Sequence, residues 1–248
     1  MRWNLLLALL AASWGFIAVL VAAVDLDAES LAFARLALAA LTLAALAAAS
    51  GRARLLRPGA HLPALALLGL AQGAHWLLFF VAVKEGSVAL AALTFYTAPV
   101  FIALAAPLFL RERLSWVVAG ALAVGTAGVA LVSAGGPGGG YSAGAVAAGI
   151  GSAVTYAALV ILSKRLLAGR AAPLTVAFWD CLVGAVVVAP TLLLASRVVP
   201  EGAGEWGAVL LLGIVFSGLA TLAYATLLRR VRAQTAGILT FLEPVAAV

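Results

Sequence analysis

Long apolar blocks, separated by short charged or glycine-rich segments, make up most of this chain. Each block has about 20 residues, the length at which a helix crosses the hydrocarbon core of a bilayer. The expected complete spans are Trp3–Val24, Ser30–Ser50, Leu62–Val83, Gly86–Leu110, Leu114–Ala134, Ala143–Ser163, Ala171–Ser196 and Trp206–Leu228. A ninth block begins near Ala233 and is about 16 residues long, which is short for a span. The pattern therefore predicts eight full membrane helices and a partial ninth.

Composition supports a helical membrane protein. The chain is 66% hydrophobic and 10% charged, whereas a soluble domain usually carries about 25% charged residues. A membrane β-barrel would alternate apolar and polar residues in segments of about ten, and this chain does not. We therefore expect an all-α, polytopic helical bundle with the lipid bilayer as its surroundings.

The net charge of +6 is explained by membrane topology rather than by a nucleic-acid partner. Lys and Arg collect in the cytoplasmic loops of membrane proteins. With the N-terminus in the cytoplasm, the outside loops hold only Lys84 and Arg197. The inside loops then hold Arg2, Arg52, Arg54, Arg57, Arg111, Arg113, Lys164, Arg165, Arg170, Arg229, Arg230 and Arg232. This bias predicts a multi-pass protein of the inner (cytoplasmic) membrane with a cytoplasmic N-terminus.

The two halves of the chain resemble each other at an offset of 145 residues. Phe33 then corresponds to Phe178, and Pro99 to Pro244. A Gly- and Pro-rich segment separates the halves, which predicts a first repeat at 1–134, an extracytoplasmic linker at 135–142 and a second repeat at 143–248. Because each repeat would hold five spans, an odd number, the second copy is expected to be inverted, as in many secondary transporters. We expect this second copy to be truncated within its fourth helix.

Several short motifs carry a family resemblance. They are Ser13-Trp14-Gly15, Phe33-Ala34-Arg35, the Pro99 helix running into Glu112-Arg113-Leu114, and Phe241-Leu242-Glu243-Pro244. Together they resemble the drug/metabolite transporter superfamily, specifically its EamA-type ten-helix exporters. The chain departs from the family at Arg111, where Gly is common, and lacks the end of the ninth helix and the tenth. The resemblance implies movement of small metabolites, such as amino acids, through a cavity between two helical bundles.

Three ionisable residues inside apolar blocks are candidates for substrate binding or coupling. Glu243 lies about ten residues into the ninth block, at a depth where a charge usually faces a cavity or a partner. It would carry a proton or bind a substrate ammonium group, or else serve as a structural carboxylate. Arg35 and Asp180 correspond under the repeat. Inversion should place them near opposite membrane faces, with Arg35 snorkelling at the outer interface, so we expect no salt bridge between them.

Aromatic side chains within the helices are further candidates for the substrate cavity. His75 would join a proton relay or hydrogen-bond to a helix carbonyl. The remaining candidates, for which packing is the alternative explanation, are Trp14, Trp76, Phe79, Tyr96, Tyr156 and Tyr224. Pro99 and Pro244 interrupt helical hydrogen bonding, and paired bends there would act in gating or would simply be inherited kinks. Trp3, Trp116 and Trp206 lie near span ends, which is typical of interface anchors.

Motifs for catalysis, nucleotides and metals are missing from the sequence. It contains no P-loop, no His-Glu-x-x-His and no Cys/His cluster, so we expect no catalytic residues, no metal and no cofactor. The leading hypothesis is a secondary transporter, more specifically an exporter of small organic metabolites. A passive facilitator of the same fold and a membrane-embedded lipid-modifying enzyme are the alternatives. Substrate, direction, coupling to a proton or another ion, and homodimerisation are left open.

Overall fold

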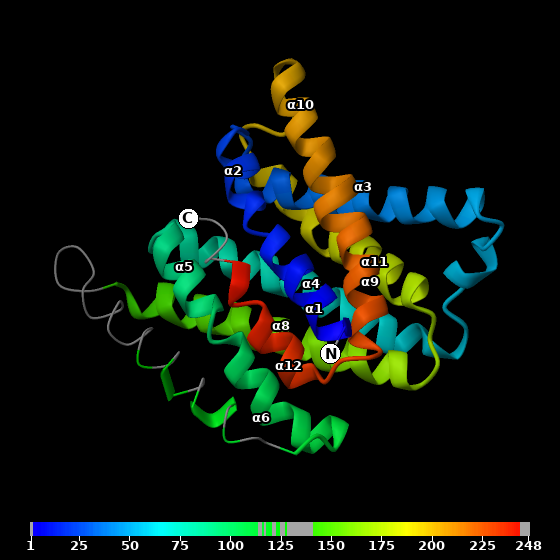
Figure 1. Ribbon diagram of the computed structural model, residues 1–248. Helices are drawn as coiled ribbons and strands as arrows, with labels where there is room; N and C mark the ends of the chain where they lie inside the picture. The colour runs from blue at the N-terminus through cyan, green and yellow to red at the C-terminus, as the bar shows by residue number, and fades with distance from the viewer. Residues whose placement is uncertain are drawn as a thin grey trace.

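The computed structural model describes residues 2–113, 116, 118–120, 123, 124, 127 and 141–243. The described residues form helices and loops without strands, which confirms the all-α prediction (Figure 1). The α-helices are α1 (Arg2–Ser13), α2 (Phe16–Ala22), α3 (Ala28–Ala49), α4 (Leu62–Glu85), α5 (Val88–Phe95), α6 (Ala98–Leu110), α8 (Ala143–Ala168), α9 (Pro173–Val188), α10 (Gly202–Leu211), α11 (Ala220–Leu228) and α12 (Ala233–Leu239). The others are the 3-10 helices η1 (Ala53–Leu56), η2 (Gly59–His61) and η3 (Ala189–Leu194), and the π-helix η4 (Leu212–Leu219).

Among the residues that the structure describes, six helical segments are long and apolar enough to cross a membrane. They are Ala28–Ala49, Ala53–Glu85, Val88–Leu110, Ala143–Ala168, Pro173–Leu194 and Gly202–Leu228. The expected fifth span, Leu114–Ala134, lies largely outside the described residues, and α1 is a shorter apolar helix. The chain is therefore a multi-pass membrane protein, while the count of eight spans stays a prediction.

The first apolar block is interrupted, although the pattern predicts one continuous helix. Between α1 and α2 the backbone N–H groups of Trp14 and Gly15 donate three residues back, to the carbonyls of Ala11 and Ala12 at 3.1 and 3.0 Å. Ser13 Oγ also donates to the Leu10 carbonyl at 2.6 Å. This tight turn changes the direction of the helix at Trp14.

Pro99 lies in the first turn of α6 rather than in the middle of a continuous helix. Proline is tolerated there because the first N–H groups of a helix have no internal acceptor. The break comes just before it, where the Thr97 N–H donates to the Thr94 carbonyl at 3.1 Å. The same carbonyl accepts the Thr97 hydroxyl at 2.6 Å, so two donors from one residue hold the turn.

A matching break follows α12 in the second half of the chain. The Thr240 N–H and hydroxyl both donate to the Gly237 carbonyl, at 3.3 and 2.7 Å. Leu242 and Glu243 therefore follow a turn as a new helical segment, instead of lying within one long helix. The predicted bend residue Pro244 lies outside the described residues. The corresponding helices also begin 145 residues apart, α3 and α9 at Ala28 and Pro173, and α5 and α12 at Val88 and Ala233.

Helices from the two halves of the chain interleave. The first-half helix α4 packs mainly against the second-half helices α8 and α9, and α3 packs mainly against α9 and η4. A Cβ at Gly69 of α4 would lie only 2.8 Å from Val183 Cγ1 and 3.0 Å from the Trp179 carbonyl oxygen of α9. Small residues allow such close approach between membrane helices. Helices of the two expected repeats thus pack directly against one another.

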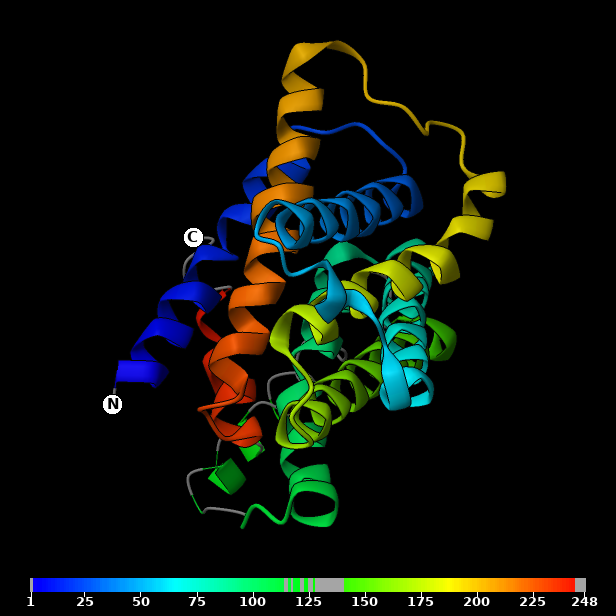
Figure 2. The ribbon, with the colours of Figure 1, turned by 90° about the vertical axis from the view of Figure 1, so that its right-hand side faces the viewer.

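The N-terminal helix packs against the C-terminal part of the chain. α1 contacts α11 and α12, and it runs beside the steep α10–η4–α11 helix in both ribbon views (Figures 1 and 2). Fully buried side chains such as Leu7, Leu68 and Val160 belong to one large apolar core formed by both halves. This arrangement brings the break at Trp14 and the break after α12 close to the same central space.

Candidate substrate cavity

One cavity of about 260 Å³ lies where the two halves of the chain meet. In the first half, its lining comes from the turn between α1 and α2 and from α2, α3, α4 and α5 with the residue that follows it. In the second half, the lining comes from α8, α9, η4, α11 and the segment after α12. All ten candidate residues for binding or coupling line it: Trp14, Arg35, His75, Trp76, Phe79, Tyr96, Tyr156, Asp180, Tyr224 and Glu243. Their functional roles stay predictions, but the fold brings every one of them to a single space.

Arg35 supplies the positive charge of the cavity. Its Nε donates to Ser217 Oγ at 3.2 Å, and its Cζ lies 5.2 Å from the centroid of the Trp76 ring, a cation–π contact. No carboxylate oxygen of the described residues lies within 4.0 Å of its guanidinium nitrogens. The outer nitrogens of this arginine thus remain available for an anionic group.

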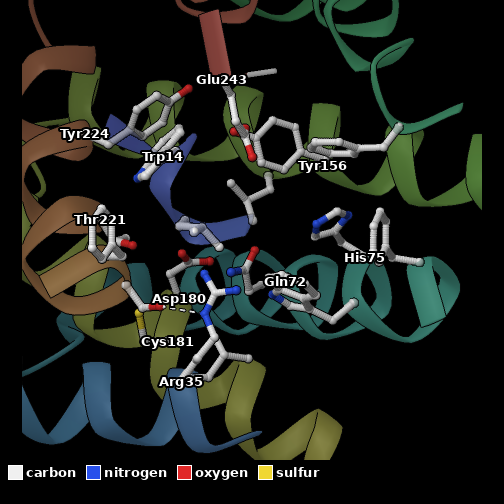
Figure 3. A pocket seen from close by; sticks show the side chains of 18 of the residues that line it. Trp14, Arg35, Gln72, His75, Tyr156, Asp180, Cys181, Thr221, Tyr224 and Glu243 are labelled. Atoms are coloured by element: carbon white, nitrogen blue, oxygen red, sulfur yellow. Dashed lines mark hydrogen bonds between the residues drawn. The ribbon is translucent and has the colours of Figure 1, made fainter. Parts of the chain in front are cut away.

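The prediction that Arg35 and Asp180 lie near opposite membrane faces is wrong. Both line the central cavity, and Figure 3 shows the Arg35 guanidinium pointing inward beside Asp180 instead of toward an interface. The two residues correspond under the repeat, and the interleaved packing of α3 against α9 places them together. As expected, no ion pair within 4.0 Å joins them.

Two carboxylates face the same space from different helices. Asp180 on α9 is only 5% exposed, and its Oδ1 has no hydrogen-bond partner among the described residues. Glu243 enters from the segment after α12, and in Figure 3 its side chain points into the cavity from the side opposite Arg35. Because an unpartnered buried carboxylate is costly, Asp180 is suited to meet a cation or a proton, and the half-buried Glu243 faces the same space.

Aromatic rings form one end of the cavity. The His75 ring centroid lies 5.1 Å from that of Phe95 and 5.4 Å from that of Tyr156. Phe95 and Tyr156 contact each other edge to face at 5.1 Å. Nδ1 of His75 lies 2.8 Å from Ser152 Oγ and 3.2 Å from the Ser152 carbonyl oxygen. His75 therefore contacts Ser152 of the neighbouring helix α8 and also lines the cavity. A role in a proton relay stays a prediction.

Other aromatic candidates complete the wall. Trp14 and Tyr224 form a second pair, with ring centroids 5.7 Å apart. Tyr96 lies 5.8 Å from Phe95 and 6.3 Å from Phe241. The cavity consequently has an aromatic lining around a small group of charges, an arrangement that suits an amphipathic organic ion.

Sequence reasoning missed several polar members of the wall. They are Gln72, Cys181, Ser217 and Thr221. Gln72 is a polar residue within an apolar helix, so the sequence alone could have identified it as a candidate for the cavity wall. Ser217 gave no comparable signal because its orientation depends on the wide π-turn of η4, and such turns are frequent at functional sites.

A second group of charges lies where α2 leads into α3 and η3 leads into α10. Arg197 pairs there with Asp25, and its Nη2 lies 3.2 Å from Glu205 Oε2 and 3.4 Å from Glu201 Oε2. Lys84 pairs with Glu29 nearby. The pKa of Asp27 is lowered because the backbone N–H groups of Arg197 and Ser196 donate to its carboxylate. We name these residues the loop-end network.

The described lining of the cavity differs from that of a metal centre. No group of three or more His, Cys, Asp or Glu side chains that could hold a metal ion occurs within the part of the chain that the structure describes. The described cavity instead offers one cation, two carboxylates and stacked rings. Such groups are chemically capable of binding an organic ion and of exchanging a proton.

Known proteins support a transport role. A solved crystal structure of a protein superposes with a TM-score of 0.81 at 25% identity, covering 99% of this chain and 84% of that one. An uncharacterized transporter, YxxF, of Bacillus subtilis (strain 168) is 26% identical over 180 residues. That match covers 70% of this chain and 56% of the relative, so the chain spans just over half of its length. The EamA-like transporter family model matches residues 1–134 and 143–248. The chain therefore belongs to the EamA-like transporter family.

Proposed function

We propose that this protein is a secondary transporter that exports small organic metabolites, such as amino acids, across the cytoplasmic membrane. The observation that carries the proposal is the central cavity, in which Arg35, Asp180 and Glu243 meet without an ion pair among them. Its volume of about 260 Å³ is slightly below the range of about 300–1,000 Å³ for drug-sized ligands. This size favours a single small metabolite.

The charges of the cavity match the two ends of an amino acid. A carboxylate would accept hydrogen bonds from the free nitrogens of Arg35, whose fork geometry suits two oxygens at once. The substrate ammonium group would lie against Asp180, whose Oδ1 has no other partner among the described residues. The ring cluster of His75, Phe95 and Tyr156 would contact the substrate side chain.

Alternating access between two inverted repeats provides the transport mechanism of this proposal. Corresponding helices begin at one constant offset, and the fourth helix of each copy breaks into two segments at a Thr-containing turn. The cavity lies between the copies, which is where inverted-repeat transporters place their substrates. The excess of Lys and Arg in alternate loops supports an N-terminus in the cytoplasm.

Glu243 is the proposed coupling residue. It follows the turn after α12 and faces the cavity from the side opposite Arg35 (Figure 3). Protonation would neutralise the Glu243 carboxylate before the cavity switches from facing one side of the membrane to facing the other. An inward proton gradient would then drive metabolite export through exchange at this one carboxylate.

Transport assays in proteoliposomes test this proposal. We would measure uptake of a panel of radiolabelled amino acids into inside-out-oriented vesicles, with and without a pH gradient. The gradient should accelerate accumulation by the wild type, whereas Glu243→Gln should keep downhill flux and lose the acceleration. The control Glu201→Gln alters an 80% exposed carboxylate side chain of the loop-end network and should behave as wild type.

Other results of these assays would contradict the proposal in distinguishable ways. Saturable flux that ignores the gradient in the wild type would indicate a passive facilitator. Unchanged gradient dependence in Glu243→Gln would refute coupling at that residue while leaving transport intact. Turnover of added lipid without any solute flux would indicate a membrane-embedded enzyme.

A further inference from the structure

A second, separate hollow of about 260 Å³ lies between the ends of α8 and α11. Its lining consists of Lys164, Leu167, Ala168, Arg229 and Arg230. Three of these five side chains are cationic, and none is acidic. The hollow is distinct from the substrate cavity, since the two share no lining residue.

The arginines of this hollow lack acidic partners. Every ion pair among the described residues involves Lys84 or Arg197, so none involves Arg229 or Arg230. Glu112 lies near the same loop, but its carboxylate accepts the backbone N–H groups of Ala233 and Gln234 at 3.0 and 3.4 Å. The two arginines are exposed, and like charges side by side repel unless an anion lies between them.

Lys164 is held differently from the arginines. Its Nζ donates to the carbonyls of Leu228 and Val231 at 2.6 and 2.5 Å. These two carbonyls lie at and just after the C-terminus of α11, where backbone carbonyl groups have no acceptor role within the helix. Lys164 thereby fixes the loop that presents Arg229 and Arg230, while its positive charge still faces the hollow.

Trp3 brings a further cation to the edge of this region. The Cζ of Arg2 lies 5.0 Å from the centroid of its ring, and the Cζ of Arg230 lies 5.8 Å from it. Tryptophan and arginine are typical of the interface between hydrocarbon and headgroups. The hollow also lies where two membrane-crossing segments, Ala143–Ala168 and Gly202–Leu228, both end, which places it at headgroup depth.

We propose that this hollow binds the phosphate of an anionic phospholipid headgroup. Arg229 and Arg230 would donate to the phosphate oxygens. Basic pockets between membrane helices are suited to such headgroups. The position of the hollow at the ends of two spans favours a lipid headgroup over a free phosphate ion.

Native mass spectrometry of the purified full chain tests this site. The protein is partly delipidated and then titrated with phosphatidylglycerol or with phosphatidylcholine of the same acyl chains. Wild type should retain phosphatidylglycerol preferentially. The double change Arg229→Gln with Arg230→Gln should weaken that retention by about 25-fold, roughly fivefold for each arginine removed. Arg52→Gln with Arg54→Gln removes two exposed charges elsewhere and should leave the retention unchanged.

Three outcomes would overturn the proposal. Equal retention of the two lipids by wild type would show that the headgroup charge is not recognised. Equal loss in the Arg52/Arg54 control would reduce the effect to general surface charge. Displacement of phosphatidylglycerol by 10-fold excess inorganic phosphate would identify a free-anion site instead.

A charge-conserving pair separates recognition from folding. Arg229→Lys with Arg230→Lys keeps both positive charges and should retain most of the phosphatidylglycerol preference. If this pair loses as much binding as the Gln pair, the electrostatic basis of the proposal is wrong. Size-exclusion profiles that match wild type would show that all three double variants fold.

Discussion

Arg35 and Arg197 are the same residue type in opposite surroundings. Arg197 in the loop-end network has carboxylates of Asp25, Glu201 and Glu205 within ion-pair distance. Arg35 lies in the central cavity with a serine and a tryptophan as partners, and no carboxylate of the described residues pairs with it. Arg197 thus joins loop segments through ion pairs. The outer guanidinium nitrogens of Arg35, by contrast, have no carboxylate partner among the described residues, which is why we propose a ligand for them.

The energetic consequences of the two arrangements differ. Exposed ion pairs contribute about 0–1 kcal/mol each, because water screens them. A buried charge without a partner is costly, so it persists where another requirement outweighs stability. A bound ion would remove that cost in the cavity, while the loop-end network has little to gain from one.

The largest effect is expected from Asp180→Asn. The substitution keeps the shape of the side chain but removes the charge that would hold the substrate ammonium group. We expect the half-saturating concentration of the best-transported amino acid to rise about 10- to 100-fold. Flux measured over a range of substrate concentrations checks this, with Asp25→Asn in the loop-end network as the matched control. Unchanged saturation would remove Asp180 from the site.

A smaller effect is expected from Phe95→Ala at the aromatic end of the cavity. The ring contacts both His75 and Tyr156, and an aromatic pair contributes about 0.5–1.5 kcal/mol beyond its buried area. Affinity for aromatic substrates should fall about two- to tenfold, with little change for alanine. Competition by phenylalanine and by alanine against one labelled substrate measures the difference, and equal losses would argue against a side-chain role.

Arg197→Gln should affect stability slightly and transport hardly at all. Its partners lie at the loops between α2 and α3 and before α10. Its pairs with the exposed Asp25 and Glu201 are screened by water, while the pair with Glu205 joins side chains that are 28% and 13% exposed. Their loss should lower the melting temperature in detergent by a few degrees. High salt should reduce the difference from wild type. A difference that persists at high salt would show that the network acts through something other than exposed charge.

The smallest effect is a pH dependence at Asp27. Its folded pKa lies below the ordinary value of 3.8 because two backbone N–H groups donate to it. The ionised form therefore contributes stability that is present above pH 4 and is lost as the pH falls through the lowered pKa. Thermal melts at pH 5 and pH 3 should show a smaller acid-induced decrease for Asp27→Asn than for wild type. An identical decrease would exclude this contribution.

The sequence predicted much of the helical framework. The third and sixth apolar blocks begin at Leu62 and Ala143, and so do α4 and α8. Block length and flanking charge determine such positions. The breaks at Trp14 and before Ala98 were not located correctly, because they depend on turn hydrogen bonds that leave no periodic signal.

Many of the residues that line the cavity could be predicted from the sequence, but their arrangement in space could not. Polar and aromatic residues inside apolar blocks are uncommon, so each one could be selected individually. The predicted separation of Arg35 from Asp180 was wrong, because corresponding positions in inverted copies were assumed to lie near opposite faces of the membrane. Interleaved packing instead brings α3 and α9 together at the centre, and that contact is a tertiary property.

We propose that Arg35 binds the ligand, whereas Arg197 stabilises the fold. The most direct measurement is amino-acid flux into proteoliposomes that contain equal amounts of wild type, Arg35→Gln or Arg197→Gln. We expect Arg197→Gln to keep flux within about twofold of wild type, whereas Arg35→Gln should raise the half-saturating concentration by about tenfold or more. Wild-type saturation in Arg35→Gln, or an equal rise in both variants, would contradict it.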